Sequence, residues 1–189
     1  MFASRLFVVK ETGRYGKGLF AKQFIPKGTI VEFICRKDGV YSKKEFARLS
    51  KKEREFVVTH EVMRPSGIYS KHCNKKILYD NHSCDANCLS AGKWFGIIVK
   101  DIKKGEEETS DYRADGDVVH FEGGCKCGKK NCMGNSTFRP PAPKKLRDSW
   151  KRKVDDAVRL IPTVKQPLKA ALLKEHPELS YLFEKRKAE

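Results

Sequence analysis

The sequence is short of long apolar runs. No stretch approaches the roughly 18 apolar residues of a transmembrane helix, and the first residues lack the apolar segment of a secretory signal peptide. Internal repeats and low-complexity tracts are missing as well. We therefore expect an intracellular protein without a membrane partner. Its 189 residues leave room for one globular domain with an appendage.

Disulfide pairing is also not favoured by the sequence. The chain has seven cysteines, an odd number, and no mark of a secreted protein. In a reducing compartment, clustered thiols more often hold a metal ion than form disulfides. The cysteines are therefore candidate metal ligands.

Acidic residues are scarce relative to basic ones. The chain has 40 Lys and Arg against 24 Asp and Glu, which gives a formal net charge of +16. A field of this size attracts polyanions such as DNA, RNA or ribosomes. The alternative interpretation is a generic basic surface without a nucleic-acid partner.

Short segments rich in β-branched and aromatic residues predict a mostly β domain that ends near residue 123. The expected strands are residues 6–10, 29–35, 55–63 and 93–100. Glycines and a proline predict turns over residues 13–28. One helix is expected over residues 42–56, where Ser42 can act as the N-cap and Glu45 completes a capping box.

A proline-rich break at residues 139–143 precedes a helical C-terminal part. Helices are expected within residues 144–161 and 166–189, two or three in all. Residues 139–189 carry 14 basic and seven acidic residues, a net charge of +7. The C-terminal part is therefore predicted to be a basic helical extension.

Three cysteines lie close together between these two parts. Cys125, Cys127 and Cys132 are interleaved with glycine and lysine, which favours a surface loop whose thiols deprotonate readily. Zinc takes four ligands in a tetrahedron, so one more ligand is needed. The candidates are Cys84, Cys88, Cys35, Cys73 and a histidine such as His120.

Four segments, in this order, resemble a known family. They are GRYGKGLFAKQFIPKGTIVEF from residue 13, DNHSCDANC from residue 80, KKGEEETSDY from residue 103 and CKCGKKNC from residue 125. Together they resemble the SET-domain protein-lysine methyltransferases with a post-SET zinc segment. The resemblance implies a mostly β fold of the β-clip type, with short strands and a knot-like crossing, plus a C-terminal α-helical extension.

The resemblance covers roughly residues 3–138 and divides the chain into three parts. Residues 3–123 form a SET domain, residues 124–138 a post-SET zinc segment, and residues 139–189 the basic helical C-terminal extension. The family's knot-like crossing joins the NHSC stretch to the later Asp-Tyr segment.

A binding site for S-adenosylmethionine is also implied by the resemblance. The residues that match cofactor-binding positions are Tyr15, Gly16, Lys17, Gly18, Asn81, His82, Tyr112 and Phe138. Tyr112 matches the family's catalytic tyrosine, whose hydroxyl orients the sulfonium methyl and the incoming amine. Other interpretations are a plain turn at the glycines, a hydrophobic anchor at Phe138, and for Tyr112 a core ring whose hydroxyl bonds a backbone carbonyl.

The family's zinc site suggests the fourth metal ligand. Cys84 matches the cysteine that reaches the post-SET segment, so one zinc ion is expected on Cys84, Cys125, Cys127 and Cys132. Cys88 is then expected to be a small buried residue.

Three positions depart from the family pattern. Ala86 stands where proline is usual, Glu108 replaces an apolar residue and Ser110 an aromatic one. We expect Glu108 to point to solvent at a sheet edge, and the alternative is altered catalysis. The positions that correspond to the family's product-multiplicity residues are Ser90 and Ser110, whose small side chains favour di- or trimethylation on steric grounds.

Methyl transfer to lysine needs a neutral amine, although the lysine pKa is about 10.4. A narrow apolar channel lowers that pKa by desolvation, so no strong general base is required. Positioning of the reactants then supplies much of the acceleration. The sequence accordingly contains no paired carboxylates or Ser-His-Asp set of the hydrolase type.

The expected function is S-adenosylmethionine-dependent methylation of lysine side chains on a protein. The substrate is expected to be a basic protein bound to nucleic acid, such as a histone or ribosomal protein, in the nucleus or on chromatin if the source is eukaryotic and otherwise in the cytoplasm. An acidic groove that includes Glu106, Glu107 and Glu108 is a second way to attract a basic substrate. Two alternatives remain, a catalytically weak SET-like scaffold and a zinc-stabilised nucleic-acid-binding protein.

Overall fold

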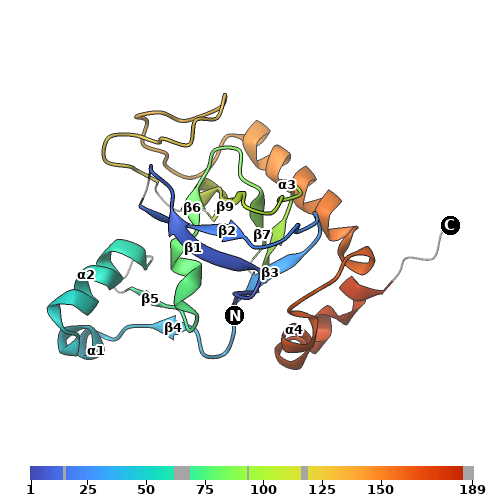
Figure 1. Cartoon of the computed structure of the whole chain (residues 1–189), viewed down its shortest axis with the longest axis horizontal. Coiled ribbons are helices and arrows are strands. Elements are labelled where there is room, and N and C mark those ends of the chain that lie inside the picture. The colour runs from blue at the N-terminus through green and yellow to red at the C-terminus, as the bar shows by residue number, and fades with distance from the viewer. Residues whose placement is uncertain (15, 62–68, 93, 116–118, 185–189) are drawn as a thin grey trace.

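A mixed β-sheet forms the centre of the molecule (Figure 1). The computed structural model describes residues 1–14, 16–61, 69–92, 94–115 and 119–184. Within these residues the sheet has the strand order β1-β2-β9-β7-β8-β3, with β6 beside β9. The strands are β1 (Phe7–Glu11), β2 (Lys17–Ala21), β3 (Ile30–Phe33), β6 (Asn81–His82), β7 (Cys88–Ala91), β8 (Phe95–Ile98) and β9 (Glu107–Ser110). A second small sheet pairs β4 (Gly39–Val40) with β5 (Ser70–Lys71).

This architecture confirms the predicted fold class of a mostly β domain with a helical C-terminal part. β1, β3 and β8 overlap the segments predicted as strands. β2 lies inside residues 13–28, where the glycines predict turns, so the prediction is wrong for this strand. Leu19 and Ala21 of β2 are buried, and β2 pairs with both β1 and β9. Pairing on both sides therefore outweighs the glycine content.

The single helix predicted from Ser42 is in fact two helices. They are α1 (Lys43–Arg48) and α2 (Lys51–His60). Each starts with Ser-Lys-Lys-Glu, and in both motifs the serine and glutamate form a reciprocal capping box. The second box, at Ser50 and Glu53, begins a new helix that runs through the segment predicted as a strand from residue 55. That strand prediction is wrong up to His60, and residues 62 and 63 lie outside the described residues.

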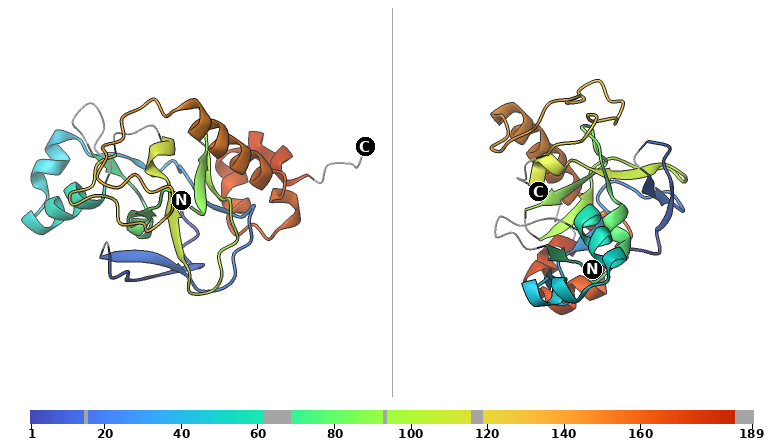
Figure 2. Two further views of the ribbon diagram at one scale, coloured as in Figure 1. Left: turned by 90° about the horizontal axis from the view of Figure 1, so that it is seen from above. Right: turned by 90° about the vertical axis from the view of Figure 1, so that its left-hand side faces the viewer.

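Helices lie at both ends of the molecule's long axis (Figure 2). α1 and α2 lie at one end, and α3 (Lys144–Val158) and α4 (Lys169–Glu175) lie on the other side of the sheet. Helices were predicted in both C-terminal segments, and the last five residues of the chain lie outside the described part. Within the described residues no helix combines the length and apolar character needed to cross a bilayer.

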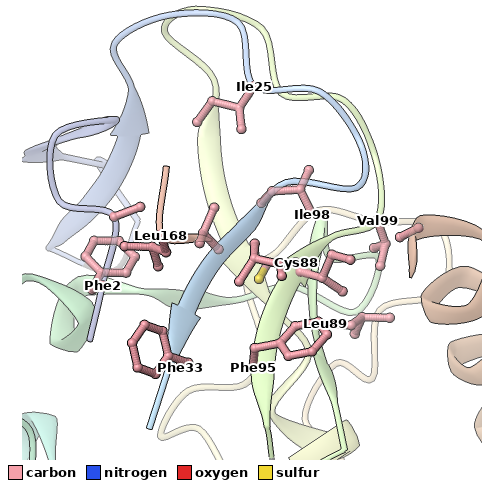
Figure 3. Close-up of a cluster of buried hydrophobic side chains, with 14 of the residues drawn as sticks. Phe2, Ile25, Phe33, Cys88, Leu89, Phe95, Ile98, Val99 and Leu168 are labelled. Carbon is pink, nitrogen blue, oxygen red and sulfur yellow. The ribbon is translucent and has the colours of Figure 1, made fainter. Parts of the chain in front are cut away.

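The C-terminal helices share the core of the sheet. Leu172 of α4 and Ala157 of α3 are completely buried within the same cluster as Ile97 and Ile98 of β8. Figure 3 shows Leu168, which precedes α4, beside Phe2 at the other end of the chain. Burying one leucine side chain stabilises the fold by about 1.5–3 kcal/mol, so these helices contribute substantially to the stability of the β domain.

Cys88 lies in the middle of this apolar cluster (Figure 3). Its exposed fraction is 1%, as expected for a small buried residue without a metal. Cys88 pairs with Ser110 across β7 and β9, two parallel strands. The core therefore reaches Ser110, the last residue of β9 before the segment that contains Tyr112.

The segment after β9 crosses the Asp80–Cys84 stretch. The Ser83 N–H donates to the Ser110 carbonyl at 2.9 Å, and Tyr112 Oη donates to the Asp80 carbonyl at 2.5 Å. β6 and β7 both lie parallel to β9, so the chain passes β9 on two sides. This crossing places the polar NHSC stretch beside Tyr112.

Candidate active site

Asn81 joins three strands at one end of the crossing. Its Nδ2 atom donates to the Lys17 carbonyl oxygen at 3.0 Å and to Glu107 Oε1 at 2.9 Å. Gly18 packs against the same groups, because a Cβ there would lie 2.5 Å from Glu107 Oε1 and 2.8 Å from Asn81 Nδ2. Gly18 is therefore required for close packing around Asn81.

The turn before β2 needs glycine for a different reason. Gly16 has a φ of +74°, in the left-handed region that favours glycine. The Thr12 N–H donates to the Gly16 carbonyl at 2.6 Å and closes the turn. Gly16 and Lys17 are exposed, so the turn is accessible to a ligand. Tyr15, which was predicted to contact the cofactor, lies outside the described residues.

The His82 ring is buried between two aromatic rings. Its centroid lies 5.3 Å from that of Tyr112 and 5.1 Å from that of Phe121. Burial lowers the pKa of His82 to about 4, so the imidazole is neutral near pH 7. Its Nδ1 accepts a hydrogen bond from the Tyr112 N–H at 3.3 Å, which fixes the tyrosine backbone against β6.

Tyr112 is half-buried, and its hydroxyl bonds the main chain. The hydroxyl donates to the Asp80 carbonyl, so Tyr112 has the contact expected for a tyrosine with a structural role. Burial and the carboxyl groups of Asp80 and Glu108 raise the pKa of Tyr112 well above its usual value. The side chain is therefore a neutral phenol, able to orient a neighbouring group but not to act as a base.

Two cavities are lined by residues that contact or follow this tyrosine. The smaller, about 360 Å³, is lined by Asn81 and His82 together with Arg14. The larger, about 650 Å³, is lined by residues that include Ala114 and Asp115, which lie in the same 3-10 turn as Tyr112. Tyr112 is not among the described lining residues of either cavity, but its ring packs on His82 of the smaller one, and its 3-10 turn carries Asp115 of the larger one.

The four cysteines predicted as zinc ligands lie together. Their sulfur atoms, from Cys84, Cys125, Cys127 and Cys132, all lie within 4.8 Å of one another. A tetrahedral site with Zn–S bonds of about 2.3 Å has sulfurs about 3.8 Å apart, and the Cys84 and Cys125 sulfurs are 4.0 Å apart. The donor set and its spacing are therefore compatible with zinc.

The other candidates for the fourth ligand lie elsewhere. Cys88 is in the core, and the sulfurs of Cys35 and Cys73 face each other at 3.1 Å in a separate group with Asp38. His120 is exposed, and its Nδ1 lies 2.9 Å from Thr137 Oγ1. Among the described residues, Cys84 alone of these candidates joins the three clustered thiols.

Hydrogen bonds from two segments, around Asn131 and around Arg113, hold the cysteine cluster against the crossing. Asn131 Nδ2 donates to the Cys84 carbonyl at 2.7 Å, and the Met133 N–H donates to Cys84 Sγ at 3.3 Å. The Arg113 guanidinium also donates to the Cys84 carbonyl, at 3.3 Å, and pairs with Asp111 at 2.7 Å. The cysteine loop is thus tied to the residues that flank Tyr112.

A model of the SET domain family matches residues 16–113, more than half of the chain. The chain belongs to the SET domain family. SET domain proteins are typically lysine methyltransferases, and those enzymes use S-adenosylmethionine. A search of curated proteins gave no significant match. The match includes the NHSC stretch and Tyr112 and ends before the clustered cysteines.

Glu108 of the SET domain does not point to solvent, so that prediction is wrong. Its exposed fraction is 2%, because β9 lies between β2 and β7 rather than at the sheet edge. Burial, together with the nearby Glu32 carboxyl, raises the pKa of Glu108 to about 8. A buried acid thus occupies the position where the family commonly has an apolar residue.

The remaining predicted site residues have separate surroundings. Ser90 lines the larger cavity, and its Oγ donates to Asp115 Oδ1 at 2.7 Å. Ser110 pairs with His82 across β9 and β6. Phe138 is half-buried and pairs with Val119 through two backbone hydrogen bonds. Ser110 therefore lies at the crossing and Ser90 lies in the wall of the larger cavity, whereas Phe138 belongs to the segment that follows the cysteines.

Sequence reasoning missed several residues of the SET domain site. Asn87 bridges to β9, because its Nδ2 donates to the Glu107 carbonyl at 2.8 Å and its Oδ1 accepts from the Thr109 N–H at 2.9 Å. Phe121 covers the outer face of His82. In the sequence, Phe121 could have been recognised as an aromatic residue shortly before Cys125. Asn87 could have been recognised as the second asparagine of NHSCDAN.

Proposed function

We propose that this SET domain transfers methyl groups from S-adenosylmethionine to lysine side chains of a protein substrate. The observation that carries the proposal is the position of Tyr112, which packs on His82 in the wall of one cavity and lies in the 3-10 turn that supplies Asp115 to the wall of the other. A cofactor in the smaller cavity and a lysine side chain in the larger one would approach Tyr112 from different sides. This arrangement keeps the two reactants separate until their reacting atoms meet.

The smaller cavity suits an amino-acid cofactor. S-adenosylmethionine carries a carboxylate, an ammonium and a sulfonium, and the cavity offers Arg14 and Glu107 as well as the amide of Asn81. Its volume lies within the range of about 300–1,000 Å³ that is usual for small-molecule sites. Further proposed contacts come from the Gly16–Gly18 turn and from Phe138. When bound, the cofactor supplies an electrophilic methyl group.

Tyr112 is proposed to orient the lysine amine. Its hydroxyl can release the Asp80 carbonyl or accept a hydrogen bond while still donating one, because a phenol does both. The raised pKa keeps the phenol protonated, so its part is positioning rather than proton removal.

The four cysteines are proposed to hold one zinc ion as a structural site. Four thiolates complete the zinc coordination and leave no open position for catalysis. The bound ion would join Cys84 of the crossing to residues 124–138, the proposed post-SET segment. Residues 124–138 could then close the smaller cavity, because Cys127 and Lys129 of this segment line it.

The test is methylation of a basic protein mixture with labelled S-adenosylmethionine. Wild-type protein should label lysine residues, and Tyr112→Phe should reduce the rate by about 100-fold or more while cofactor binding persists. Tyr181→Phe is the matched control, because Tyr181 is 63% exposed on the C-terminal helices. No labelling by wild type, with cofactor bound, would favour the catalytically weak scaffold instead.

The proposed substrate is a basic protein associated with nucleic acid, such as a histone or ribosomal protein. The net charge of +16 supports this proposal, because a polyanion can bridge two basic proteins. In a eukaryotic source the corresponding location would be the nucleus or chromatin. Mass spectrometry of the labelled proteins would identify the target lysines.

A further inference from the structure

The described lining residues of the larger cavity carry the opposite charge to the molecule as a whole. The acidic residues Glu32, Asp38 and Asp115 line it, and no Lys or Arg is among its described lining residues. Two nitrogen groups there already have acidic partners: His72 Nδ1 lies 2.6 Å from Glu61 Oε2, and the amino terminus lies 3.5 Å from Asp38 Oδ2. An acidic cavity in a protein of charge +16 points to a cationic ligand.

Glu32 is one of the carboxyl groups that line this cavity. It lies on β3 opposite Gly96 of β8, and its carboxylate occupies the space that a side chain at position 96 would need. Gly96 lies opposite Ser90 of β7, whose hydroxyl holds Asp115. The absence of a side chain at Gly96 thus leaves room for the Glu32 carboxylate.

Two further acids, Glu108 and Asp80, interact electrostatically with Glu32. Glu108 is 2% exposed, and its Oε2 has no hydrogen-bond partner among the described residues. Asp80 Oδ1 also lacks a partner within the described part of the chain. No salt bridge between described residues involves Glu32, Asp80 or Glu108. A buried carboxyl group normally pairs with a cation or becomes protonated, so this group of acids lacks a counterion.

Burial and the neighbouring carboxyl groups raise the pKa of Glu32. Burial and the Asp115 carboxylate raise the pKa of Glu32 to about 7, against a weaker opposing effect of the amino terminus. Asp80 has a pKa raised well above its usual value by burial and by Glu108. Glu32 therefore changes protonation near neutral pH, as a general base should.

We infer that Glu32 receives the ammonium group of the substrate lysine in this cavity and removes its proton, with Asp115 as a second anionic wall. This inference rests on the proposed function, and it assigns to this chain a general base that a desolvated channel alone does not need. Asp115 lines the cavity with Glu32 and lies in the same 3-10 turn as Tyr112. The tyrosine hydroxyl bonds the Asp80 carbonyl.

The proposed step balances as follows. The Glu32 carboxylate takes a proton from the lysine ammonium, so an N–H bond breaks and an O–H bond forms. The neutral amine then forms an N–C bond to the methyl group as the S–C bond of the sulfonium breaks, which leaves a thioether and a methylammonium. The proton on Glu32 returns to solvent through the open cavity, and the next cycle begins with the carboxylate.

The pH dependence follows from the sign of the Glu32 shift. The base form is the ionised one, so the rate should rise as pH increases through about 7. The groups that face Glu32 are Asp38, Asp80, Glu108, Asp115 and the amino terminus. Cys88 and Tyr112 stay protonated in this range, because burial raises the pKa of each.

The decisive variant is Glu32→Gln, which keeps the side-chain size and removes the base. We expect the rate at pH 7 to fall by about 100-fold and the rise of the pH–rate profile to move to higher pH. Gly96→Ala should have a similar effect, because its Cβ displaces the Glu32 carboxylate without changing Glu32. Glu11→Gln, at an exposed position of β1, should leave rate and profile unchanged.

A binding experiment without cofactor separates this inference from the proposed function. Calorimetry near pH 7, in two buffers of different ionisation enthalpy, should show proton release when a lysine peptide binds. A cation lowers the pKa of Glu32 and so expels part of its proton. A norleucine peptide and the Glu32→Gln variant should show no such release.

The outcomes are distinct. A wild-type enzyme that methylates lysine, together with a Glu32→Gln variant of unchanged rate and pH profile, would overturn the role of Glu32. Proton release on binding of the lysine peptide by a wild type that transfers no methyl group would support the ammonium site and contradict the proposed function. Equal binding of lysine and norleucine peptides would rule out the ammonium site.

Discussion

Single side chains around the crossing determine how tightly the chain can close on a ligand. Asn81, Gly18 and Glu107 fit together so closely that one additional methyl group would displace an amide or a carboxylate. Cys84 is held through both its sulfur and its carbonyl. At such positions a small substitution should have a specific effect on binding rather than a general effect on folding.

Gly18→Ala should weaken cofactor binding. The new Cβ would push Asn81 Nδ2 and Glu107 Oε1 out of the smaller cavity's wall. We expect affinity for S-adenosylmethionine to fall by about tenfold, or about 1.4 kcal/mol, when measured by calorimetry. Gly39→Ala is the control, since nothing lies within 4 Å of a Cβ there. Equal affinities of the two variants would contradict the placement of the cofactor beside Asn81.

Cys84→Ser should reduce bound zinc. The change replaces one of four thiolates with a weak oxygen ligand, so metal content measured after mild chelation should fall. Cys73→Ser, at an exposed cysteine outside the cluster, should retain its zinc. Full zinc occupancy of Cys84→Ser would require a different fourth ligand.

Product multiplicity depends on the room beside the lysine. Ser90 is small, and its hydroxyl is already bonded to Asp115. We therefore expect two or three methyl groups on a peptide substrate under excess cofactor, as measured by intact mass. Ser90→Tyr should restrict the product to fewer methyl groups. A wild-type product with one methyl group, formed by enzyme that is still active, would contradict this expectation.

Among the elements, the C-terminal helices are part of the core rather than a separate appendage. Leu168, Leu172 and Ile161 belong to the same buried cluster as the sheet. Trp150 Nε1 of α3 donates to Asp111 Oδ2 at 3.1 Å, next to Tyr112. The division of the chain at residue 139 remains a prediction, and the shared core gives it a measurable consequence.

Leu172→Ala should destabilise the whole SET domain. It removes a completely buried side chain, which typically costs about 2–5 kcal/mol. Urea unfolding should show one cooperative transition at lower denaturant, when followed both by the helical circular-dichroism signal and by the fluorescence of the two tryptophans. Lys174→Ala, exposed on the same helix, should change little. Two separate transitions would indicate that residues 139–189 fold independently.

The whole molecule combines a strongly basic surface with an acidic cavity. The net charge of +16 opposes the approach of a free basic protein, whereas Glu32 and Asp115 attract its lysine side chain at short range. Long-range repulsion is screened by salt, with a Debye length of about 10 Å at 0.1 M. Within the cavity the attraction is screened less.

Salt should therefore change substrate preference. At low ionic strength we expect faster methylation of a basic protein on nucleic acid than of the free protein, because the polyanion bridges two basic partners. Rates measured across a salt series should converge as the bridging weakens. Faster methylation of the free protein at every salt concentration would contradict bridging.

The sequence by itself determined the family, the capping box at Ser42 and the four cysteines that cluster. These features depend on short motifs whose chemistry is local. Only the tertiary structure decided which other residues are buried next to those motifs. Glu108 looked like a solvent-facing acid, but strand order buried it between β2 and β7. Glu32 gave no signal in the sequence, because its role depends on a glycine more than 60 residues away that leaves room for its carboxylate. Side-chain alternation along one strand cannot reveal which strand will pair beside it, and that pairing sets the burial and the charge of the site.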